Sequence, residues 1–345
     1  MLRGMSDRQL AHVDPANHGQ LARLELVAEQ ARDYAAEAKA PNTRRAYAAD
    51  WRAFTEWCSS AGLGSLPATG DTVALYLTSQ AGMLKTSTLQ RRLSAISQAH
   101  QVAGHETPIR SAAVRLVWAG IRRKHGTAQT GKAPALIEDL RDMVDAMAPQ
   151  VRRVRGQGSR APEPWPLLAL RDRALLLLGF AGAFRRSELV GLNFEDLEVG
   201  RAGIAVNLRR SKTDQEGQGR KIGIPRGTGL TCPVKAVQEW LQATGIESGP
   251  LFRPVNRHGQ LQPGRLSDRA VALVVKRWAE AIGLDPEVFA GHSLRAGLAT
   301  SAAAAGASER AIANQTGHKS MAVLRRYIRD GELFRDNAAA AALGL

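Results

Sequence analysis

Residues 291–327 read GHSLRAGLATSAAAAGASERAIANQTGHKSMAVLRRY and carry the spacing of short helices. The pattern predicts helices at about residues 293–305, 308–316 and 320–329. A turn that contains Gly317 joins the second to the third, and this pair is similar to a helix-turn-helix. The C-terminal part of the chain is therefore expected to be helical.

The sequence before this stretch predicts further helices and one small sheet. Ile204, Val206 and Leu208 alternate with other residues, as do Ile222 and Ile224, so two antiparallel strands are expected. The polar loop SKTDQEGQG lies between them. Helices are expected at residues 136–147, 167–181, from 187, 233–244 and 267–282.

The N-terminal part of the chain predicts a small helical domain. Tyr47, Trp51, Phe54 and Cys58 recur at intervals of four, three and four residues, which places them on one face of a helix. No alternating segment indicates a strand between residues 41 and 125. This part is therefore predicted to be all-helical.

Capping patterns predict where the next helices of this domain begin. Asp71 is expected to cap a helix that starts at Thr72, and Ser87 with Gln90 has the pattern of a capping box. Pro108 opens another helix, since proline is favoured in a first turn.

The length of 345 residues suggests about two domains. With 44% hydrophobic and 23% charged residues, the chain can bury a core. The predicted fold class is mainly α: a helical N-terminal domain and a mostly helical second domain with a small antiparallel sheet. The expected divisions are an N-terminal arm at residues 1–40, the helical domain at 41–125, a linker at 126–135 and the second domain at 136–345.

The charge balance favours a polyanionic partner. Lys and Arg number 47 against 32 Asp and Glu, a net charge of +15 that is spread over both halves of the chain. Cys58 and Cys232 are the two cysteines, and they have no metal-binding spacing, which suits a reducing cytoplasm. The most apolar run, Ala174–Ala183, is too short to span a bilayer, and no secretory leader is recognised. Membrane insertion is not expected.

Motifs for metal or nucleotide chemistry were not found. The chain has no GxxxxGK[ST] loop, no HExxH and no paired Asp cluster, so no metal and no cofactor are expected. An enzyme that acts on phosphodiesters without metal must neutralise the transition state with its own cations. Arginine suits this role because its fork can bind two phosphate oxygens.

Three motifs of the C-terminal half resemble the signature of the tyrosine recombinase, or phage integrase, family. That signature is an Arg in RxSEL, a later HxxR, and a GH followed nine residues on by Tyr. The order and spacing of these motifs match across residues 185 to 327, and the resemblance as a whole covers about residues 40 to 340. The N-terminal domain would correspond to the family's SAM-like core-binding domain. The motif residues are Arg185 and Glu188 in AFRRSEL, His292 and Arg295 in GHSLRAG, and His318 and Tyr327 in TGHKSMAVLRRY.

The resemblance implies the role of each motif residue. Tyr327 would attack the scissile phosphate and form a 3′-phosphotyrosine intermediate, and it needs help because a phenol is a weak nucleophile at neutral pH. Arg185 and Arg295 would bind the non-bridging oxygens in place of a metal. His292 would accept or share the phenol proton, and His318 would donate a hydrogen bond to the phosphate.

The resemblance also implies two supporting groups. Glu188 would orient its neighbours. Lys212 in the SKTD loop would be the general acid for the 5′-oxygen, although Lys221 and Arg210 lie close to it in sequence. Basic residues near helix ends of the N-terminal domain are the candidates for DNA-backbone contact: Arg44, Arg45, Arg52, Arg91, Arg92, Arg122, Arg123 and Lys124.

The implied partner is a double-stranded DNA recombination site, bound by a homotetramer that brings two sites together. The Ala-rich segment Leu333–Leu345 would be the tail that docks into a neighbouring subunit. The expected location is the bacterial cytoplasm, at the nucleoid, with the gene on a chromosome or a mobile element.

Other interpretations remain open for single residues. Arg185 could belong to a charge pair at a helix end, Glu188 could serve any first turn, His292 could cap a helix, and Tyr327 could be a core residue. The alternative function is a non-catalytic DNA-binding regulator, in which ASERAIANQTGHKSMAVLRRY forms a helix-turn-helix, His318 is a turn residue and Tyr327 is a core residue. The subfamily is also open. Phe184 stands where many members have Leu, and Ala296 where the Xer branch has His; His318 stands where Cre has Trp.

Overall fold

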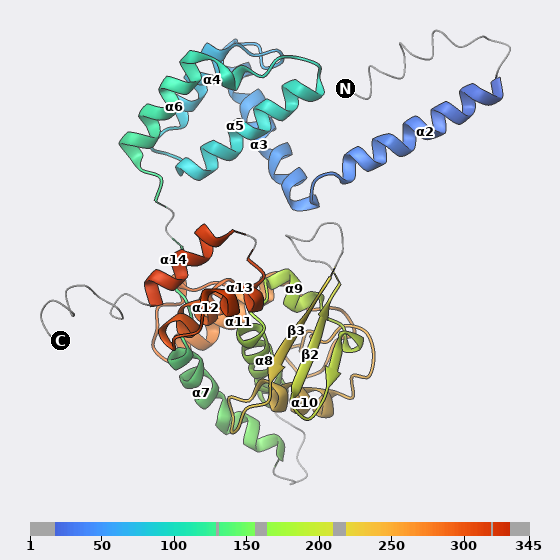
Figure 1. The fold of residues 1–345 in the computed structure, drawn as a ribbon, viewed down its shortest axis with the longest axis vertical. Coiled ribbons are helices and arrows are strands. Elements are labelled where there is room, and N and C mark those ends of the chain that lie inside the picture. Colours follow the sequence, from blue (N-terminus) through green and yellow to red (C-terminus); the bar gives the residue numbers. More distant parts are fainter. Residues whose placement is uncertain (1–17, 129–130, 156–163, 210–218, 319, 332–345) are drawn as a thin grey trace, which may run out of the picture. The chain divides into compact units, whose positions relative to one another are not determined.

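The computed structural model describes residues 18–128, 131–155, 164–209, 219–318 and 320–331. The chain divides into two compact units, Met1–Thr130 and Gly131–Leu345 (Figure 1).

The N-terminal unit is a set of helices around one apolar core. Phe54, Tyr76, Leu89 and Ile96 have no exposed surface and lie at its centre. Trp57 also packs on Tyr76, with 5.3 Å between ring centroids. The helices around this core are α3 (Pro41–Ser60), α4 (Gly70–Gln80), α5 (Thr86–Val102) and α6 (Ala112–His125). Helix α2 (His18–Glu37) precedes them and contributes none of its described side chains to the core.

Both caps predicted for this unit are wrong. The hydroxyl of Thr69, not Asp71, accepts from the backbone N–H of Thr72, because α4 begins before Asp71 and takes that residue into its first turn. Helix α5 begins at Thr86 and follows Lys85, which makes no side-chain cap. The turns that enter these helices, more than the residue types, determine which side chain reaches the open N–H groups.

The C-terminal unit is larger and combines helices with a sheet (Figure 1). Its helices are α7 (Ile137–Arg155), α8 (Pro164–Ala181), α9 (Arg186–Gly191), α10 (Pro233–Thr244), α11 (Asp268–Ala281), α12 (Ser293–Ala304), α13 (Glu309–Thr316) and α14 (Met321–Gly331). Its strands are β1 (Leu197–Val199), β2 (Gly203–Leu208) and β3 (Arg220–Pro225).

Helix α8 is the centre of this unit and packs against α7, α10, α11 and α12. It is apolar on all sides, which is typical of a buried helix. Three consecutive charged residues are nevertheless buried on it, Arg171, Asp172 and Arg173. Asp172 has no exposed surface and accepts hydrogen bonds from Arg171, Arg277 and Trp278. A buried carboxylate needs such partners because losing its hydration is costly.

The three strands form an antiparallel sheet in the order β1-β2-β3. In the β2–β3 pair, Leu208 lies opposite Arg220 and Val206 opposite Ile222. Ile222 and Ile224 are buried, whereas Lys221 between Arg220 and Ile222 is exposed. Arg220 therefore shares the covered face of β3 with the two isoleucines, since alternate residues of a strand face the same side.

The mainly α fold with a small antiparallel sheet is confirmed. The two predicted strands are β2 and β3, and β1 is an addition that no alternating pattern marks. Residues 133 and 135, which the sequence places in the linker, donate backbone hydrogen bonds to Val288 and Ser293 of the C-terminal unit. Among the helices of the described residues, none has the length and apolar character needed to cross a bilayer.

Candidate active site

The first part of the site is the turn from α8 into α9. Glu188, with 2% of its side chain exposed, accepts hydrogen bonds from the backbone N–H of Arg185 at 2.8 Å and from its guanidinium at 2.5 Å. One carboxylate therefore both caps α9 and holds the Arg185 side chain, which is 17% exposed. Glu188 is thus a first-turn residue that also holds the Arg185 side chain.

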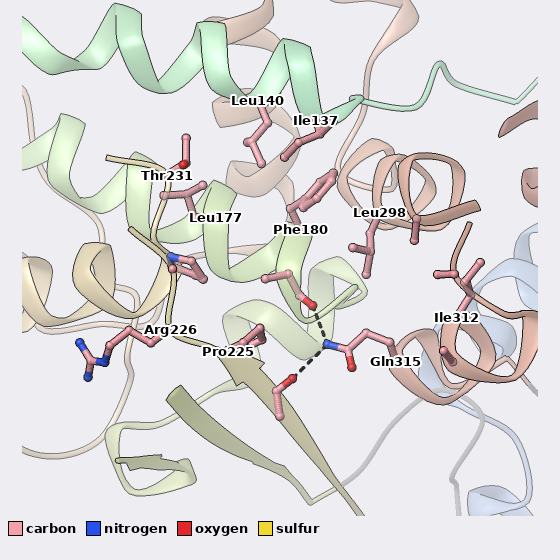
Figure 2. A pocket seen from close by; sticks show the side chains of 17 residues that line it. Ile137, Leu140, Leu177, Phe180, Pro225, Arg226, Thr231, Leu298, Ile312 and Gln315 are labelled. Carbon is pink, nitrogen blue, oxygen red and sulfur yellow. Dashed lines mark hydrogen bonds between the residues drawn. The ribbon is translucent and has the colours of Figure 1, made fainter. Parts of the chain in front are cut away.

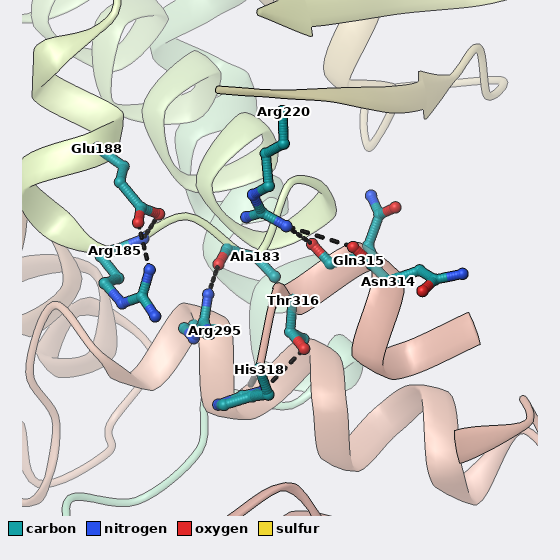
Figure 3. A network of polar contacts seen from close by, with 9 residues as sticks. All are labelled: Ala183, Arg185, Glu188, Arg220, Arg295, Asn314, Gln315, Thr316 and His318. Carbon is teal, nitrogen blue, oxygen red and sulfur yellow. Dashed lines mark hydrogen bonds and ion pairs between the residues drawn. The ribbon is translucent and has the colours of Figure 1, made fainter. Parts of the chain in front are cut away.

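Arg295 enters the site from α12 and is 1% exposed. Its Nη1 donates to the carbonyl of Ala183 at 2.8 Å (Figure 3). Ala183 has a φ of 48°, a left-handed conformation that is unfavourable for alanine and turns its carbonyl toward Arg295. The other two guanidinium nitrogens of Arg295, Nε and Nη2, are buried and have no hydrogen-bond partner among the described residues.

Burial is the main reason why the pKa of Arg295 falls to about 10, and the nearby charge of Arg185 lowers it further. Buried donors without partners destabilise a folded chain. An arginine kept in this state is suited to bind an anion that arrives with a ligand.

His292 and Tyr327 face each other across the site. The Nε2 atom of His292 lies 3.3 Å from the hydroxyl of Tyr327, and the ring centroids are 6.5 Å apart. His292 occupies the N-cap position of α12 but makes no side-chain cap there, so the capping interpretation is not what the structure has. Tyr327 comes from α14, and its ring partly packs on the small core of α12, α13 and α14.

His318 lies just after α13, and its position determines its tautomer. Its Nδ1 is 2.7 Å from the hydroxyl of Thr316, which is itself buried and donates its proton to the carbonyl of Ile312 at 2.7 Å (Figure 3). The Thr316 oxygen must then accept, so His318 carries its proton on Nδ1. In the neutral ring, Nε2 is a hydrogen-bond acceptor.

The pKa of His318 is lowered to about 4, first by burial and then by the charges of Arg295 and Arg185. His292 and Arg220 lower it further. Before DNA binds, His318 is therefore neutral at pH 7, and it can donate from Nε2 only after taking up a proton.

Arg220 is a further cation of the site that the sequence analysis missed. Its Nη1 donates to the carbonyls of Asn314 and Gln315 at 3.2 Å each (Figure 3). Burial lowers its pKa, Glu188 raises it, and Arg185 lowers it. The signal that could have revealed it is the alternation of β3, which puts Arg220 on the same face as Ile222.

The site as a whole is a cluster of cations beside a phenol. The charge of Arg185 disfavours the protonated forms of Arg220, Arg295 and His318, and the Glu188 carboxylate favours those of Arg220 and Arg295. Among the described residues, no group of three or more His, Cys, Asp or Glu side chains could hold a metal ion. The arrangement suits a reactant that brings negative charge to Tyr327.

Lys212, the predicted general acid, lies outside the described residues, as does Arg210. Lys221 is described and pairs with Glu198 at 2.5 Å, with both side chains more than half exposed. It lies on the opposite face of β3 from Arg220, so it does not join the cluster.

The predicted DNA contacts of the N-terminal unit differ in their surroundings. Arg91 makes two hydrogen bonds to buried Asp50, at 2.7 and 3.1 Å. Arg92, 16% exposed, donates to Tyr76 and Gln80. These two arginines thus have structural contacts. Of all the candidates, Arg92 alone is half-buried; the exposed ones are Arg44, Arg45, Arg52, Arg91, Arg122, Arg123 and Lys124.

A separate apolar cavity of about 540 Å³ lies in the same unit (Figure 2). Helices α7, α8, α12 and α13 and the end of β3 form its wall. Gln315 closes one side by donating to the carbonyls of Ala181 at 2.6 Å and Gly223 at 3.2 Å. The cavity has none of the cationic groups of the site around Tyr327, and its lining is suited to apolar side chains.

Comparison with known families gives two matches. Residues 162–332 match the phage integrase family, and residues 32–107 match the phage integrase N-terminal SAM-like domain. The first match contains the described cluster and Tyr327, and the second lies over α3 to α5.

Individual relatives agree with these matches. The chain is 42% identical to an integrase/recombinase xerD homolog of Selenomonas ruminantium over 88% of this chain and 85% of the relative. It is 26% identical to the recombinase cre of Escherichia phage P1 over 81% of each chain. The fold is similar to that of a lambda integrase dimer bound to a core site, with a TM-score of 0.55, 17% identity and coverage of 91% of this chain and 95% of that one. It is also similar to XerH site-specific recombinase in a post-cleavage complex, with a TM-score of 0.56, 16% identity and coverage of 80% and 72%.

Proposed function

The chain belongs to the phage integrase family, and from this premise we propose that it is a tyrosine recombinase that cleaves and rejoins duplex DNA at specific sites. The observation that carries the proposal is the convergence of Arg185, Arg295, His292 and His318 on Tyr327 from separate elements of one unit. The alternative, a regulator without catalysis, gains nothing from the relatives and leaves the unpartnered donors of Arg295 unexplained.

The reaction begins with attack of the Tyr327 oxygen on the scissile phosphorus. The new bond joins the phenolic oxygen to the 3′-phosphate, and the bond from phosphorus to the 5′-oxygen breaks. His292 accepts the phenol proton, since its Nε2 lies 3.3 Å from the hydroxyl. Lys212 donates a proton to the leaving 5′-oxygen.

The arginines stabilise the charge that develops on the phosphate. The unpartnered Nε and Nη2 of Arg295 donate to a non-bridging oxygen, and Arg185, held by Glu188, donates to the other. The two arginines thus neutralise the charge that a metal ion would otherwise neutralise. No ATP is needed, because the phosphotyrosine bond conserves the energy of the broken phosphodiester.

His318 has a role that depends on the arrival of DNA. In the free protein its Nε2 is an acceptor, because Nδ1 donates to Thr316. A phosphate anion next to the ring favours the protonated form and so raises its pKa. His318 then donates to the phosphate from Nε2, as the family resemblance implies, while its Nδ1 bond is kept.

Strand exchange follows from the reversibility of the first step. A free 5′-hydroxyl from a partner strand attacks the phosphotyrosine, releases Tyr327 and forms a recombinant phosphodiester. We infer that a homotetramer on two DNA sites carries out this exchange in the bacterial cytoplasm. The exposed basic side chains of the N-terminal unit, among them Arg44, Arg122 and Lys124, contact the DNA backbone.

The tail at residues 333–345 docks into a neighbouring subunit of this tetramer. Its sequence LFRDNAAAAALGL is rich in small and apolar residues, and the cavity between α7, α8, α12 and α13 is suited to receive them. Deleting residues 336–345 should leave DNA binding unchanged and weaken synapsis. Ala302→Arg places a large charged side chain in the cavity and should likewise leave DNA binding unchanged and weaken synapsis. If recombination survives both changes, the docking proposal is wrong.

The experiment that tests the function uses DNA that flanks the gene. Protein and DNA are mixed, quenched in SDS and separated on a gel, with wild type beside Tyr327→Phe and with or without EDTA. The proposal expects a covalent band from wild type alone, unchanged by EDTA. Tight, specific binding without any covalent band would favour the regulator instead.

A further inference from the structure

Arg220 is the first residue of β3, directly after the loop that contains Lys212. It lies opposite Leu208 and on the covered face of the strand, whereas its neighbour Lys221 points to the other face and is exposed. An arginine on the covered face loses hydration, which is the main cause of its lowered pKa. Such a position needs a compensating interaction.

One end of the Arg220 guanidinium has that interaction. Nη1 donates to the carbonyls of Asn314 and Gln315, near the C-terminal end of α13, where carbonyls lack helical partners. The next turn contains Gly317, with a φ of 64°. A Cβ atom there would lie 2.5 Å from Nη1, so the close approach of Arg220 requires glycine at this position.

The other end of the guanidinium has no such interaction. Nη2 is buried and has no hydrogen-bond partner among the described residues, as is also true of Nε and Nη2 of Arg295. The charge of Arg220 lowers the pKa of both Arg295 and His318. In Figure 3 the guanidinium groups of Arg185, Arg220 and Arg295 lie around Ala183. Unpartnered buried donors beside the site of phosphate chemistry indicate a shared anion.

We propose that Arg220 is a further phosphate-binding residue of the recombination site, whose Nη2 donates to a non-bridging oxygen of the scissile phosphate. Its Nη1 at the same time fixes the end of α13 that precedes His318. This inference rests on the proposed function, because it needs a scissile phosphate next to Tyr327. It adds a third guanidinium to the two that the motifs contain.

The test combines protein variants with modified DNA. Wild type, Arg220→Gln, Arg220→Lys and the matched control Lys221→Gln are compared in single-turnover cleavage of a nicked substrate that traps the covalent complex. Each is also assayed on DNA whose scissile phosphate is a methylphosphonate, as separate diastereomers, so that either non-bridging oxygen is replaced by a neutral methyl group. Circular dichroism and gel-shift affinity check that each variant folds and binds DNA.

On ordinary DNA, Arg220→Gln should slow cleavage by roughly a hundredfold, as expected for the loss of one transition-state donor. Arg220→Lys should recover part of the rate, and Lys221→Gln should match wild type. In one methylphosphonate diastereomer, the loss caused by Arg220→Gln should shrink to less than about tenfold, because the partner oxygen is already absent.

Two results would overturn the proposal. One is ordinary cleavage by Arg220→Gln. The other is an equal loss on ordinary DNA and on both methylphosphonates, which would mean that Arg220 acts only through the end of α13. Failure of the proposed function is distinguishable, because wild type itself would then form no Tyr327-dependent covalent complex.

Discussion

Glu188 makes two interactions in the site, a helix cap and an ion pair with Arg185. Its replacement therefore gives the sharpest test of how Arg185 is held. Its carboxylate caps α9 through the backbone N–H of Arg185 and binds the Arg185 guanidinium, with 2% of the Glu188 side chain exposed. Glu188→Ala removes both interactions and leaves the cationic cluster without this carboxylate. Breaking a buried ion pair costs about 3–5 kcal/mol in the free energy of unfolding.

Glu188→Gln separates the helix cap from the ion pair. The amide oxygen can still accept from the backbone N–H of Arg185, so the cap is kept, and the charged component of about 1.5–3 kcal/mol is lost. At about 2–4 °C per kcal/mol for a unit of this size, the melting temperature should fall by roughly 5 °C for Gln and roughly 10 °C for Ala. Cleavage by the Gln variant should slow by about ten- to a hundredfold, because Arg185 is no longer held in place.

The assay is thermal melting followed by circular dichroism, together with single-turnover cleavage at a temperature where all variants are folded. Glu280→Gln is the matched control, since it removes the same charge from an exposed position on α11. If Glu188→Gln melts and cleaves like this control, Glu188 does not position Arg185, and the reasoning about the turn into α9 is refuted.

Three other predictions concern two groups of the site, His318 and Arg295, and the buried carboxylate of Asp172 on α8. The pKa of His318 in the folded chain, about 4, lies below its ordinary value of 6.5, so its contribution to the free energy of unfolding is present above about pH 6.5 and is lost as the pH falls toward 4. With allowance for partial exposure, the pH-dependent contribution of His318 amounts to about 1–2 kcal/mol. The melting temperature of His318→Gln should therefore depend less on pH than that of wild type. An unchanged pH dependence would contradict the lowered pKa of His318. Arg295→Met should abolish cleavage and raise the free energy of unfolding by about 1 kcal/mol, because it removes buried donors without partners. Urea titration measures this free energy, and a variant less stable than wild type would contradict the prediction. Asp172→Ala should destabilise the C-terminal unit by about 3–5 kcal/mol, since it leaves Arg171 buried without its carboxylate, while the cleavage rate per folded molecule stays unchanged; an altered rate would place Asp172 in the catalytic network.

The candidate site residues that sequence motifs contain lie at the ends of helices or on them. Arg185 and His292 each precede a helix, His318 follows α13, and Tyr327 lies on α14, so short motifs are enough to mark them. Local periodicity also predicted α3 and the two longer strands, and a continuous apolar run predicted α8.

The remaining features depend on tertiary contacts that no local pattern contains. Arg220 joins the site through carbonyls more than ninety positions away in the chain. Arg91 has the pattern of a solvated residue, yet it pairs with Asp50 on another helix. Strand β1 has three residues and exists because β2 offers it a partner.

The left-handed conformation of Ala183 is another feature that only the folded chain explains. Nothing in the sequence requires it, and alanine disfavours it. The turn brings the Ala183 carbonyl to Arg295 and is followed at once by buried Phe184 and then Arg185. Packing of the surrounding core therefore outweighs the local preference of one residue.

The central claim is that Tyr327 forms the covalent bond to DNA, and mapping that bond tests it most directly. Protein is trapped on a nicked recombination site, the complex is digested with protease and nuclease, and the modified peptide is sequenced by mass spectrometry. We expect one attachment point, a 3′-phosphate on the oxygen of Tyr327. Attachment at any other side chain, or recombined DNA without a covalent intermediate, would contradict it.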